Sequence, residues 1–138
     1  MFLLDTNIVS ELNKPRPAPE VTGWIRSAQQ HDLFFSVVSI AEIVKGITSH
    51  PDPVRQSALQ IWLDQFVRPW LYGRILPIPE EIAEIAGRFE GLRAAAGRPM
   101  AFADALIAAT AVKNGFTLVT RNVRDFVEIP VTLINPWK

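Results

Sequence analysis

The sequence contains no cysteine, no long hydrophobic run and no excess of charge of either sign. The absence of cysteine excludes disulfide bonds and thiolate metal sites, and it is typical of a protein of the reducing cytoplasm. No apolar run approaches the ~20 residues that a membrane-spanning helix needs. The segment from Met1 to Asp5 also lacks the basic start and long apolar stretch of a secretion signal. We therefore expect a cytoplasmic protein with no membrane partner.

The charge balance taken alone argues against a protein that binds nucleic acid. The chain has 14 basic and 14 acidic residues, whereas nucleic-acid-binding domains are often basic. This argument weakens if several acidic side chains gather at one site, because the remaining surface then leans positive.

Hydrophobic residues make up 49% of the 138 positions, which predicts a packed core and a single domain over residues 1–138. Apolar and β-branched runs predict strands at 2–4, 33–38, 75–78, 116–120 and 131–134, the last at a sheet edge because a proline precedes it. Helical patterns occupy 5–12, 19–28, 39–46, 54–67, 79–92 and 102–114. Strands that alternate with helices predict an α/β fold with three α/β/α layers and a central, mainly parallel sheet of four to five strands.

Acidic and amide side chains lie where these strands end and the following helices begin. Asp5 follows the first strand, Glu42 follows the second, Asp104 lies near the start of an apolar helix, and Asn122 and Asp125 follow the strand at 116–120. Parallel strands present their carboxyl ends to one crevice, so we expect these side chains to meet. Gathered carboxylates repel one another, and a hard cation such as Mg²⁺ or Mn²⁺ relieves that repulsion.

Each of these side chains also has an ordinary structural interpretation. Asp5 suits a helix N-cap, and Ser39 with Glu42 fits the capping-box pattern. Asp104 suits the positive end of a helix dipole, and Asp125 suits a turn. Capping does not readily explain why several independent junctions point acids to the same end of one sheet.

Four motifs in order resemble those of PIN-domain ribonucleases, and most closely the VapC and FitB-like toxins of bacterial toxin–antitoxin modules. The motifs are Phe2-Leu-Leu-Asp5-Thr-Asn7, Ser39-Ile-Ala-Glu42-Ile, Asp104-Ala-Leu-Ile-Ala-Ala-Thr110 and Leu118-Val-Thr120-Arg-Asn122-Val-Arg-Asp125-Phe126. The resemblance covers the chain from Met1 almost to its last residues, and it implies a PIN-like fold.

The resemblance also implies a catalytic metal site. The three best-defined acids of the family fall on Asp5, Glu42 and Asp104, which we expect to bind Mg²⁺ (or Mn²⁺). A fourth position that is acidic in many members is Asn122 here, so that Asn122 or Asp125 is expected to assist.

Two further groups of residues have supporting roles in this hypothesis. Orienting hydrogen bonds to the carboxylates are expected from Thr6, Asn7 and Thr120. Contacts to substrate phosphates are expected from Arg98, Arg121 and Arg124.

The implied function is that of a toxin that hydrolyses RNA, with transfer RNA the expected substrate, by a metal-activated water. The only histidines, His31 and His50, are expected on the surface and have no role in this chemistry. The implied partners are a cognate VapB/FitA-like antitoxin and a second copy of the chain, in a homodimer or a larger toxin–antitoxin assembly.

Aromatic side chains are candidates for such a partner surface. Helical spacing predicts that Trp24, Trp62 and Phe66 belong to the core, whereas Trp70 and Tyr72 are better candidates for exposure.

Three alternative functions remain open at this stage. A haloacid-dehalogenase-like phosphohydrolase requires a second Asp at the position of Asn7, and the Asn argues against it. A phosphate-receiver domain requires a Lys after its last core strand, where this chain has Thr120-Arg121-Asn122. The third alternative is a catalytically weak or inactive PIN-like domain that only binds protein or RNA, and Asn122 favours it. Three clustered carboxylates argue against it.

Overall fold

The computed structural model describes all residues, 1–138. Five strands occupy β1 (Phe2–Leu4), β2 (Leu33–Ser36), β3 (Ile75–Leu76), β4 (Thr117–Val119) and β5 (Leu133–Ile134). The α-helices are α1 (Thr6–Glu11), α2 (Pro19–Ser27), α3 (Val37–Thr48), α4 (Pro53–Trp62), α5 (Arg68–Trp70), α6 (Glu80–Ala95) and α7 (Phe102–Asn114). Short helical turns occupy η1 (Gln30–Asp32), η2 (Leu63–Val67) and η3 (Val123–Phe126).

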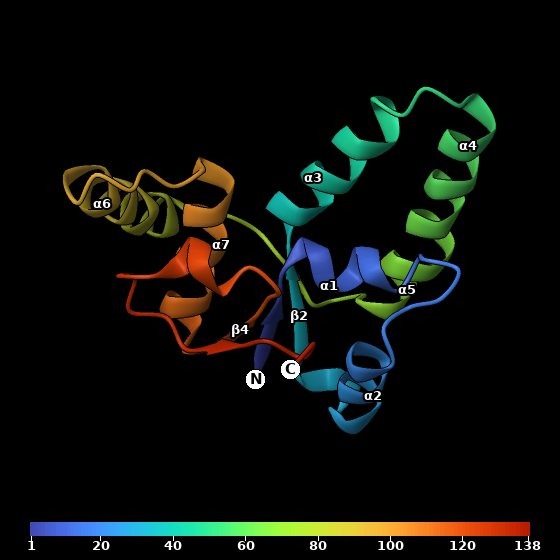
Figure 1. Cartoon of the computed structure of the whole chain (residues 1–138), viewed down its shortest axis with the longest axis horizontal. Helices are drawn as coiled ribbons and strands as arrows, with labels where there is room; N and C mark the ends of the chain where they lie inside the picture. The colour runs from blue at the N-terminus through green and yellow to red at the C-terminus, as the bar shows by residue number, and fades with distance from the viewer.

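The five strands form one sheet in the order β3-β2-β1-β4-β5, and every pair is parallel. Leu3 pairs with Phe34 on one side and with Leu118 on the other, so β1 lies at the centre. The predicted α/β fold is confirmed, with five strands and β5 at an edge. All strands point toward the end of the sheet from which α1 and α3 emerge (Figure 1).

Successive residues of the central strands pack into two separate cores, one on each face of the sheet. Leu3 and Leu118 belong to the core shared with α6 and α7, whereas Leu4 and Val119 belong to the core shared with α1, α2 and α3. This alternation is the period-2 geometry of a strand. The three-layer arrangement follows from it, because each face has its own helices to bury it.

The helix that follows β2 begins earlier than the sequence pattern predicts. Ser36 is the N-cap of α3, and its Oγ accepts a hydrogen bond from the Val38 amide at 3.0 Å. Ser39 and Glu42 therefore lie inside the helix, and their interpretation as a capping box is wrong. Ser36, three residues before Ser39, is the N-cap instead, and β2 therefore ends at residue 36 and not at 38.

The helix predicted at 54–67 is interrupted. The α-helix ends at Trp62, and a π-helical turn over Leu63–Val67 leads into α5. Pro69 lies just beyond this turn and has no amide hydrogen with which to continue the α-helical ladder. The wider turn accommodates it.

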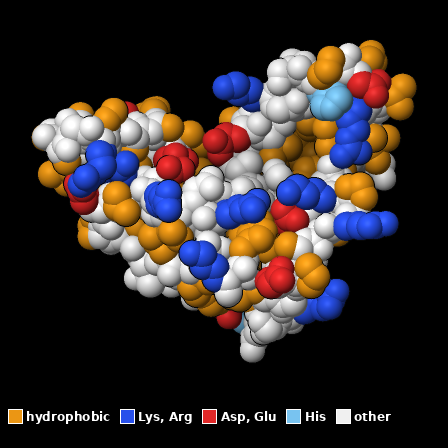
Figure 2. Space-filling model, viewed as in Figure 1, with side chains coloured by type: hydrophobic (Ala, Val, Ile, Leu, Met, Phe, Trp, Pro, Cys, Tyr) orange, Lys and Arg blue, Asp and Glu red, His pale blue; other side chains and the backbone are white.

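Two pairs of helices stand on either side of the carboxyl end of the sheet. The antiparallel hairpin of α3 and α4 projects on one side, and α6 packs against α7 on the other (Figure 1). Between them the surface is hollowed (Figure 2). No helix is both long enough and apolar enough to cross a membrane.

Candidate active site

Asp5 is the most constrained acidic side chain at the end of the sheet. It follows β1 directly, is 5% exposed, and its Oδ1 accepts a hydrogen bond from the Thr6 amide at 2.7 Å. Its Oδ2 accepts bonds from the Thr120 hydroxyl at 2.8 Å and from Asn7 Nδ2 at 3.3 Å. Asp5 is thus a helix N-cap, as its structural interpretation predicts, and it also lines the hollow. One residue serves both purposes because the cap uses one carboxylate oxygen.

The end of β4 orients Asp5 through a relay of hydrogen bonds. The Asn122 amide donates to Thr120 Oγ1 at 3.0 Å, and the Thr120 hydroxyl donates onward to Asp5. Asn7 completes the link, since its Oδ1 accepts from the Arg121 amide at 3.3 Å. The ends of β1 and β4 are therefore locked together by side chains as well as by the sheet.

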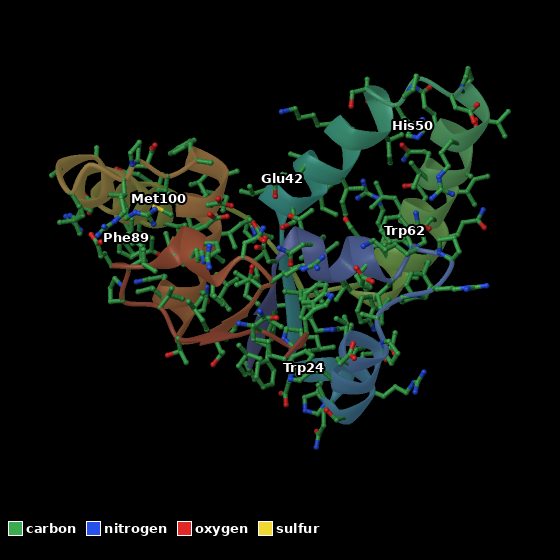
Figure 3. The ribbon with its side chains drawn as sticks, in the orientation of Figure 1. Trp24, Glu42, His50, Trp62, Phe89 and Met100 are labelled. Atoms are coloured by element: carbon green, nitrogen blue, oxygen red, sulfur yellow. The ribbon has the colours of Figure 1, made fainter.

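Glu42 is held by a hydroxyl from the neighbouring helix. It lies in the second turn of α3, above α1 (Figure 3), and its Oε1 accepts a hydrogen bond from Thr6 Oγ1 at 2.5 Å. Ser39 Oγ lies 2.8 Å from the same Thr6 oxygen. Thr6 therefore contacts two acids, Asp5 with its amide and Glu42 with its hydroxyl.

Asp104 and Asp125 come from the opposite side of the hollow. Asp104 lies in the first turn of α7 and Asp125 lies in η3, and both line one cavity of about 360 Å³ with Asp5, Glu42 and Asn122. No hydrophobic residue lines this cavity. The structure thus brings together all five residues that the sequence placed at the strand ends.

Arg93 is a buried residue of the site region that the sequence analysis missed. It lies in α6 and is 6% exposed. Its Nη1 donates to the carbonyls of Asp125 at 2.7 Å and Val127 at 3.2 Å, and its Nε donates to the Arg98 carbonyl at 2.7 Å. These bonds fasten the η3 segment, and with it Asp125, to α6. Its spacing in the stripe of Ile82, Ala86, Phe89 and Arg93 was the available signal, because a charge on an apolar helical face must be satisfied internally.

Two carboxyl groups of the cavity have a raised pKa. Burial, together with the charges of Asp5, Asp125 and Glu42 and against the opposing charge of Arg93, raises the pKa of Asp104 to about 6. Burial also raises the pKa of Asp5, against the opposing effect of its hydrogen bonds from Thr120 and Thr6. None of the four acids forms an ion pair with a basic side chain. The cavity therefore concentrates carboxylates that have no basic side chain in direct contact.

The side chains of the cavity are of the chemical type that binds a hard divalent cation, although they are not yet arranged around one point. All its charged donors are carboxylate oxygens, which Mg²⁺ and Mn²⁺ prefer. No three of the acids converge into a ready set of ligands. The candidates for rotation are Asp104 and Asp125, whose carboxylates accept no hydrogen bond, whereas Asp5 and Glu42 are already held.

The three predicted phosphate-binding arginines are separated by the fold. Arg121 and Arg124 line a second cavity of about 540 Å³, which shares Asn122 and Asp125 with the acidic one. Arg98 instead forms a surface ion pair with Glu128 and lines neither cavity. Two of the three are therefore positioned beside the acids.

An apolar groove reaches the acids from the other side. It runs between α3 and α4 and is lined at its outer part by Ile43, Ile47, Leu59 and Trp62 and at its inner end by Thr6 and Glu42, among others. Figure 3 shows Trp62 in α4, across from the helix that carries Glu42.

The other aromatic side chains divide differently from the sequence prediction. Trp24 and Trp62 pack against the core as predicted, but so does Trp70. Phe66 is 47% exposed, contrary to its predicted place in the core, and Tyr72 is 85% exposed as predicted. The π-helical turn rotates Phe66 off the face that its α-helical spacing implied.

Comparisons with known proteins place these features in context. The PIN domain family matches residues 2–131. Toxin FitB of Neisseria gonorrhoeae is 34% identical over 99% of both chains. VapC ribonuclease Y4jK of Sinorhizobium fredii is 34% identical over 100% of this chain and 99% of its own length. The tRNA(fMet)-specific endonuclease VapC of Shigella flexneri is 27% identical over 99% and 97%.

Solved structures show the same similarity. The FitAcB structure from Neisseria gonorrhoeae contains a chain that superposes with a TM-score of 0.91, at 34% identity over 99% of both chains. A chain in the structure of FitAB bound to an IR36 DNA fragment superposes with a TM-score of 0.90, at 33% identity over 100% of this chain and 96% of its own length.

Proposed function

This chain belongs to the PIN-domain family, and on that premise we propose that it is the ribonuclease toxin of a toxin–antitoxin pair. Its reaction is the hydrolysis of RNA phosphodiester bonds within a strand, and the cofactor is Mg²⁺ or Mn²⁺. Transfer RNA is the substrate class, because relatives of similar length are named tRNA(fMet)-specific endonucleases. The protein acts in the cytoplasm, where such a substrate is found.

One observation carries this proposal. Asp5, Glu42, Asp104 and Asp125 line one polar cavity at the carboxyl end of a parallel sheet, with no basic partner for any of them. Keeping such charges side by side is unfavourable in the metal-free protein, as the pKa of Asp104 near 6 reflects. A divalent cation turns that penalty into binding free energy.

Asp5, Glu42 and Asp104 are the residues that would hold the ion, with Asp125 or the Asn122 side chain assisting. A bound Mg²⁺ or Mn²⁺ supplies a Lewis acid that lowers the pKa of water and neutralises charge on a phosphate. Thr6 and Thr120 keep the Glu42 and Asp5 carboxylates facing the cavity through their hydrogen bonds. Thr6 and Thr120 are therefore positioning residues.

The protonation state of Asp104 gives the site a pH requirement. A carboxyl group with a pKa near 6 is largely ionised only above that pH. The Asp104 carboxylate is therefore available as a charged ligand at neutral pH and is protonated as the pH falls through about 6. Metal-dependent activity is therefore expected to fall as the pH falls below about 6.

Cleavage of total bacterial RNA by the purified, partner-free protein tests the proposal. Discrete fragments that need Mg²⁺ or Mn²⁺, disappear in EDTA and are absent with Asp5→Asn are the expected result. Asp52→Asn is the matched control, because Asp52 also caps a helix, α4, but lies outside the cavity. A folded, metal-replete protein that cleaves nothing would favour a binding-only PIN-like domain, and cleavage that survives Asp5→Asn would reject this metal site.

The antitoxin is proposed to bind the groove between α3 and α4. The groove offers an apolar helix four hydrophobic side chains, and its inner end opens at Glu42, where a basic side chain finds unneutralised acids. Complexes such as FitAB and FitAcB are the precedent among structural neighbours. An occupant of this kind blocks the acids and stops cleavage.

A pair of substitutions in α4 tests this placement. Leu59 lines the groove, whereas Val54 lies on the same helix with 78% of its surface exposed and outside the groove. Leu59→Lys is expected to abolish inhibition by the co-expressed antitoxin while cleavage persists, and Val54→Lys is expected to leave inhibition unchanged. Equal inhibition of both variants would place the antitoxin elsewhere.

A further inference from the structure

A second cavity adjoins the acidic one on the side of β4 and the last residues of the chain. It is lined by Arg121, Asn122, Val123, Arg124, Asp125, Asn135, Trp137 and Lys138, and its volume is about 540 Å³. Asn122 and Asp125 line both cavities, so the two adjoin. A strand bound over the acids can therefore extend toward this cavity.

The cavity contains a guanidinium group that lies over an indole ring. The Arg121 Cζ atom lies 5.1 Å from the centre of the Trp137 ring, which is a cation–π distance. Asn135 braces this pair, because its Oδ1 accepts from the Trp137 amide at 3.0 Å and its Nδ2 donates to the Arg121 carbonyl at 3.4 Å. Trp137 also packs against the core on the α1–α2 face of the sheet. The indole is thereby held in place beneath the Arg121 guanidinium group.

The basic groups of this cavity have no protein anion as partner. Arg121, Arg124 and Lys138 take part in no ion pair, although Asp125 lines the same cavity. Five other Lys and Arg side chains do pair with nearby acids: Lys14, Arg68, Arg88, Arg98 and Lys113. Basic side chains without an ion-pair partner therefore lie directly beside acidic side chains without one. Figure 2 shows Lys and Arg side chains on the surface around the hollow.

We propose that this second cavity is a nucleotide subsite, in which an unpaired base next to the cleaved bond stacks on the Arg121 guanidinium group while Arg124 and Lys138 contact phosphates. The proposal rests on the ribonuclease function and adds to it a requirement for a single-stranded nucleotide beside the cleaved bond. The Trp137 indole lies on one side of the Arg121 guanidinium group, and Arg121 is otherwise exposed.

A base explains the cavity better than a phosphate alone. A phosphate needs positive charge and hydrogen-bond donors, which Arg124 and Lys138 already provide, and it needs no aromatic support behind them. Bases of single-stranded RNA stack on aromatic rings and on Arg planes, and such stacking is tolerant of sequence. The Trp137-backed Arg121 is suited to the base, and Arg124 and Lys138 are suited to the backbone.

Fluorescence anisotropy with a labelled single-stranded oligoadenylate RNA of about eight nucleotides tests the subsite. Binding is measured in EDTA, over a range of salt concentrations, for the wild type, Arg121→Lys, Trp137→Leu and Arg124→Ala. A second set of probes carries one abasic nucleotide at each position in turn. Arg26→Ala is the control, because Arg26 is an exposed arginine of α2 that lines neither cavity.

Arg121→Lys is expected to weaken binding about 5-fold or more without changing the salt dependence, since it keeps the charge and loses the plane. With the wild type, one of the abasic probes is expected to bind more weakly than the intact probe by the same factor. With Arg121→Lys, that abasic probe is expected to bind as tightly as the intact probe. Arg124→Ala is expected to lower the slope of log K against log salt by about 0.7, which is the loss of one phosphate contact to a single strand. Arg26→Ala is expected to change neither property.

Two results would overturn the subsite. One is a wild type that binds no probe, and the other is an Arg121→Lys variant that binds as tightly as the wild type and still senses the missing base. Arg121→Lys preserves the charge and the exposed position, so a misfolded Trp137→Leu protein does not spoil the test. Failure of the nuclease function is distinguishable, because probe binding in EDTA with the predicted base dependence and no RNA cleavage would leave the subsite in place on a non-catalytic protein.

Discussion

The two halves of the acidic cavity differ in how their carboxylates are held. Asp5 and Glu42, from the ends of β1 and α3, accept hydrogen bonds from Thr6, Thr120 and Asn7. Asp104 and Asp125, from α7 and η3, accept none, and burial together with charge repulsion raises the pKa of Asp104. One half is oriented before any cation arrives, and the other is free to move toward it.

This difference divides the tasks of a metal site. The oriented half defines where an ion is bound, because its oxygens cannot easily turn away. The free half supplies charge, and its repulsion with the first half provides part of the affinity. A site built entirely from oriented carboxylates would carry a larger penalty in the metal-free protein.

The largest expected effect comes from releasing the η3 segment, which carries Asp125 of the free half. Arg93→Met removes the guanidinium group that satisfies the carbonyls of Arg98, Asp125 and Val127, and leaves these groups without a donor. We expect a loss of about 3–5 kcal/mol in the free energy of unfolding, measured by urea denaturation.

Arg88→Met is the matched control for that change. Arg88 lies in the same helix, and its pair with Glu84 is exposed at the surface. Its loss is expected to change stability by less than about 1 kcal/mol. Equal effects of the two substitutions would mean that the η3 segment does not depend on Arg93.

Metal binding is expected to hold the carboxylates of the free half as well, so that the two halves differ less in how their carboxylates are held. Mn²⁺ at about 100 times its dissociation constant should raise the free energy of unfolding by about 2.7 kcal/mol, seen as a higher melting temperature. Asp104→Asn removes a charged ligand of the free half and should lose most of that gain. If neither Mg²⁺ nor Mn²⁺ changed the melting temperature of the wild type, the cavity would bind no such ion.

Local sequence patterns predicted the fold and the gathering of acids, but not the state of each acid. Buried apolar runs identify strands, and parallel strands bring Asp5, Glu42, Asp104 and Asp125 to one end of the sheet. The hydrogen bond from Thr6 to Glu42 joins residues 36 positions apart, and no local pattern contains it.

Arg93 also shows what local sequence patterns cannot predict. Its position in an apolar stripe marks it as unusual, but its partners lie in two later loops. Phe66 was misplaced because helical spacing assumes an unbroken α-helix, and the π-helical turn before Pro69 breaks that assumption. Contacts that depend on tertiary packing are the ones that sequence periodicity misses.

A hydroxyl deletion tests whether orientation matters in the held half. Thr6→Val keeps the shape of the side chain and removes the donor to Glu42. We expect cleavage to fall about 10–100-fold at limiting metal and to recover in part at high metal, because the lost function is positioning. Thr22→Val is the control, since the Thr22 hydroxyl bonds only to a carbonyl within α2. Full activity of Thr6→Val would mean that Glu42 needs no positioning.

The smallest expected effect is the pH dependence of the free half in the metal-free protein. The pKa of Asp104 is raised from 3.8 to about 6 on folding, so the folded state binds the proton more tightly than the unfolded state. Stability is therefore highest below about pH 4 as far as this group is concerned, and it is lost as the pH rises through 6. After allowance for partial exposure, the loss is about 1–2 kcal/mol.

Asp104→Asn should lack this loss, so in EDTA the variant is expected to be more stable than the wild type at pH 7.5, with the advantage disappearing near pH 4. The difference between the two proteins measures Asp104 together with its repulsion with Asp5. Urea denaturation at a series of pH values measures the difference. A variant that is equally or less stable at pH 7.5 would mean that Asp104 has a partner in solution, and that the free half of the cavity is held as firmly as the other.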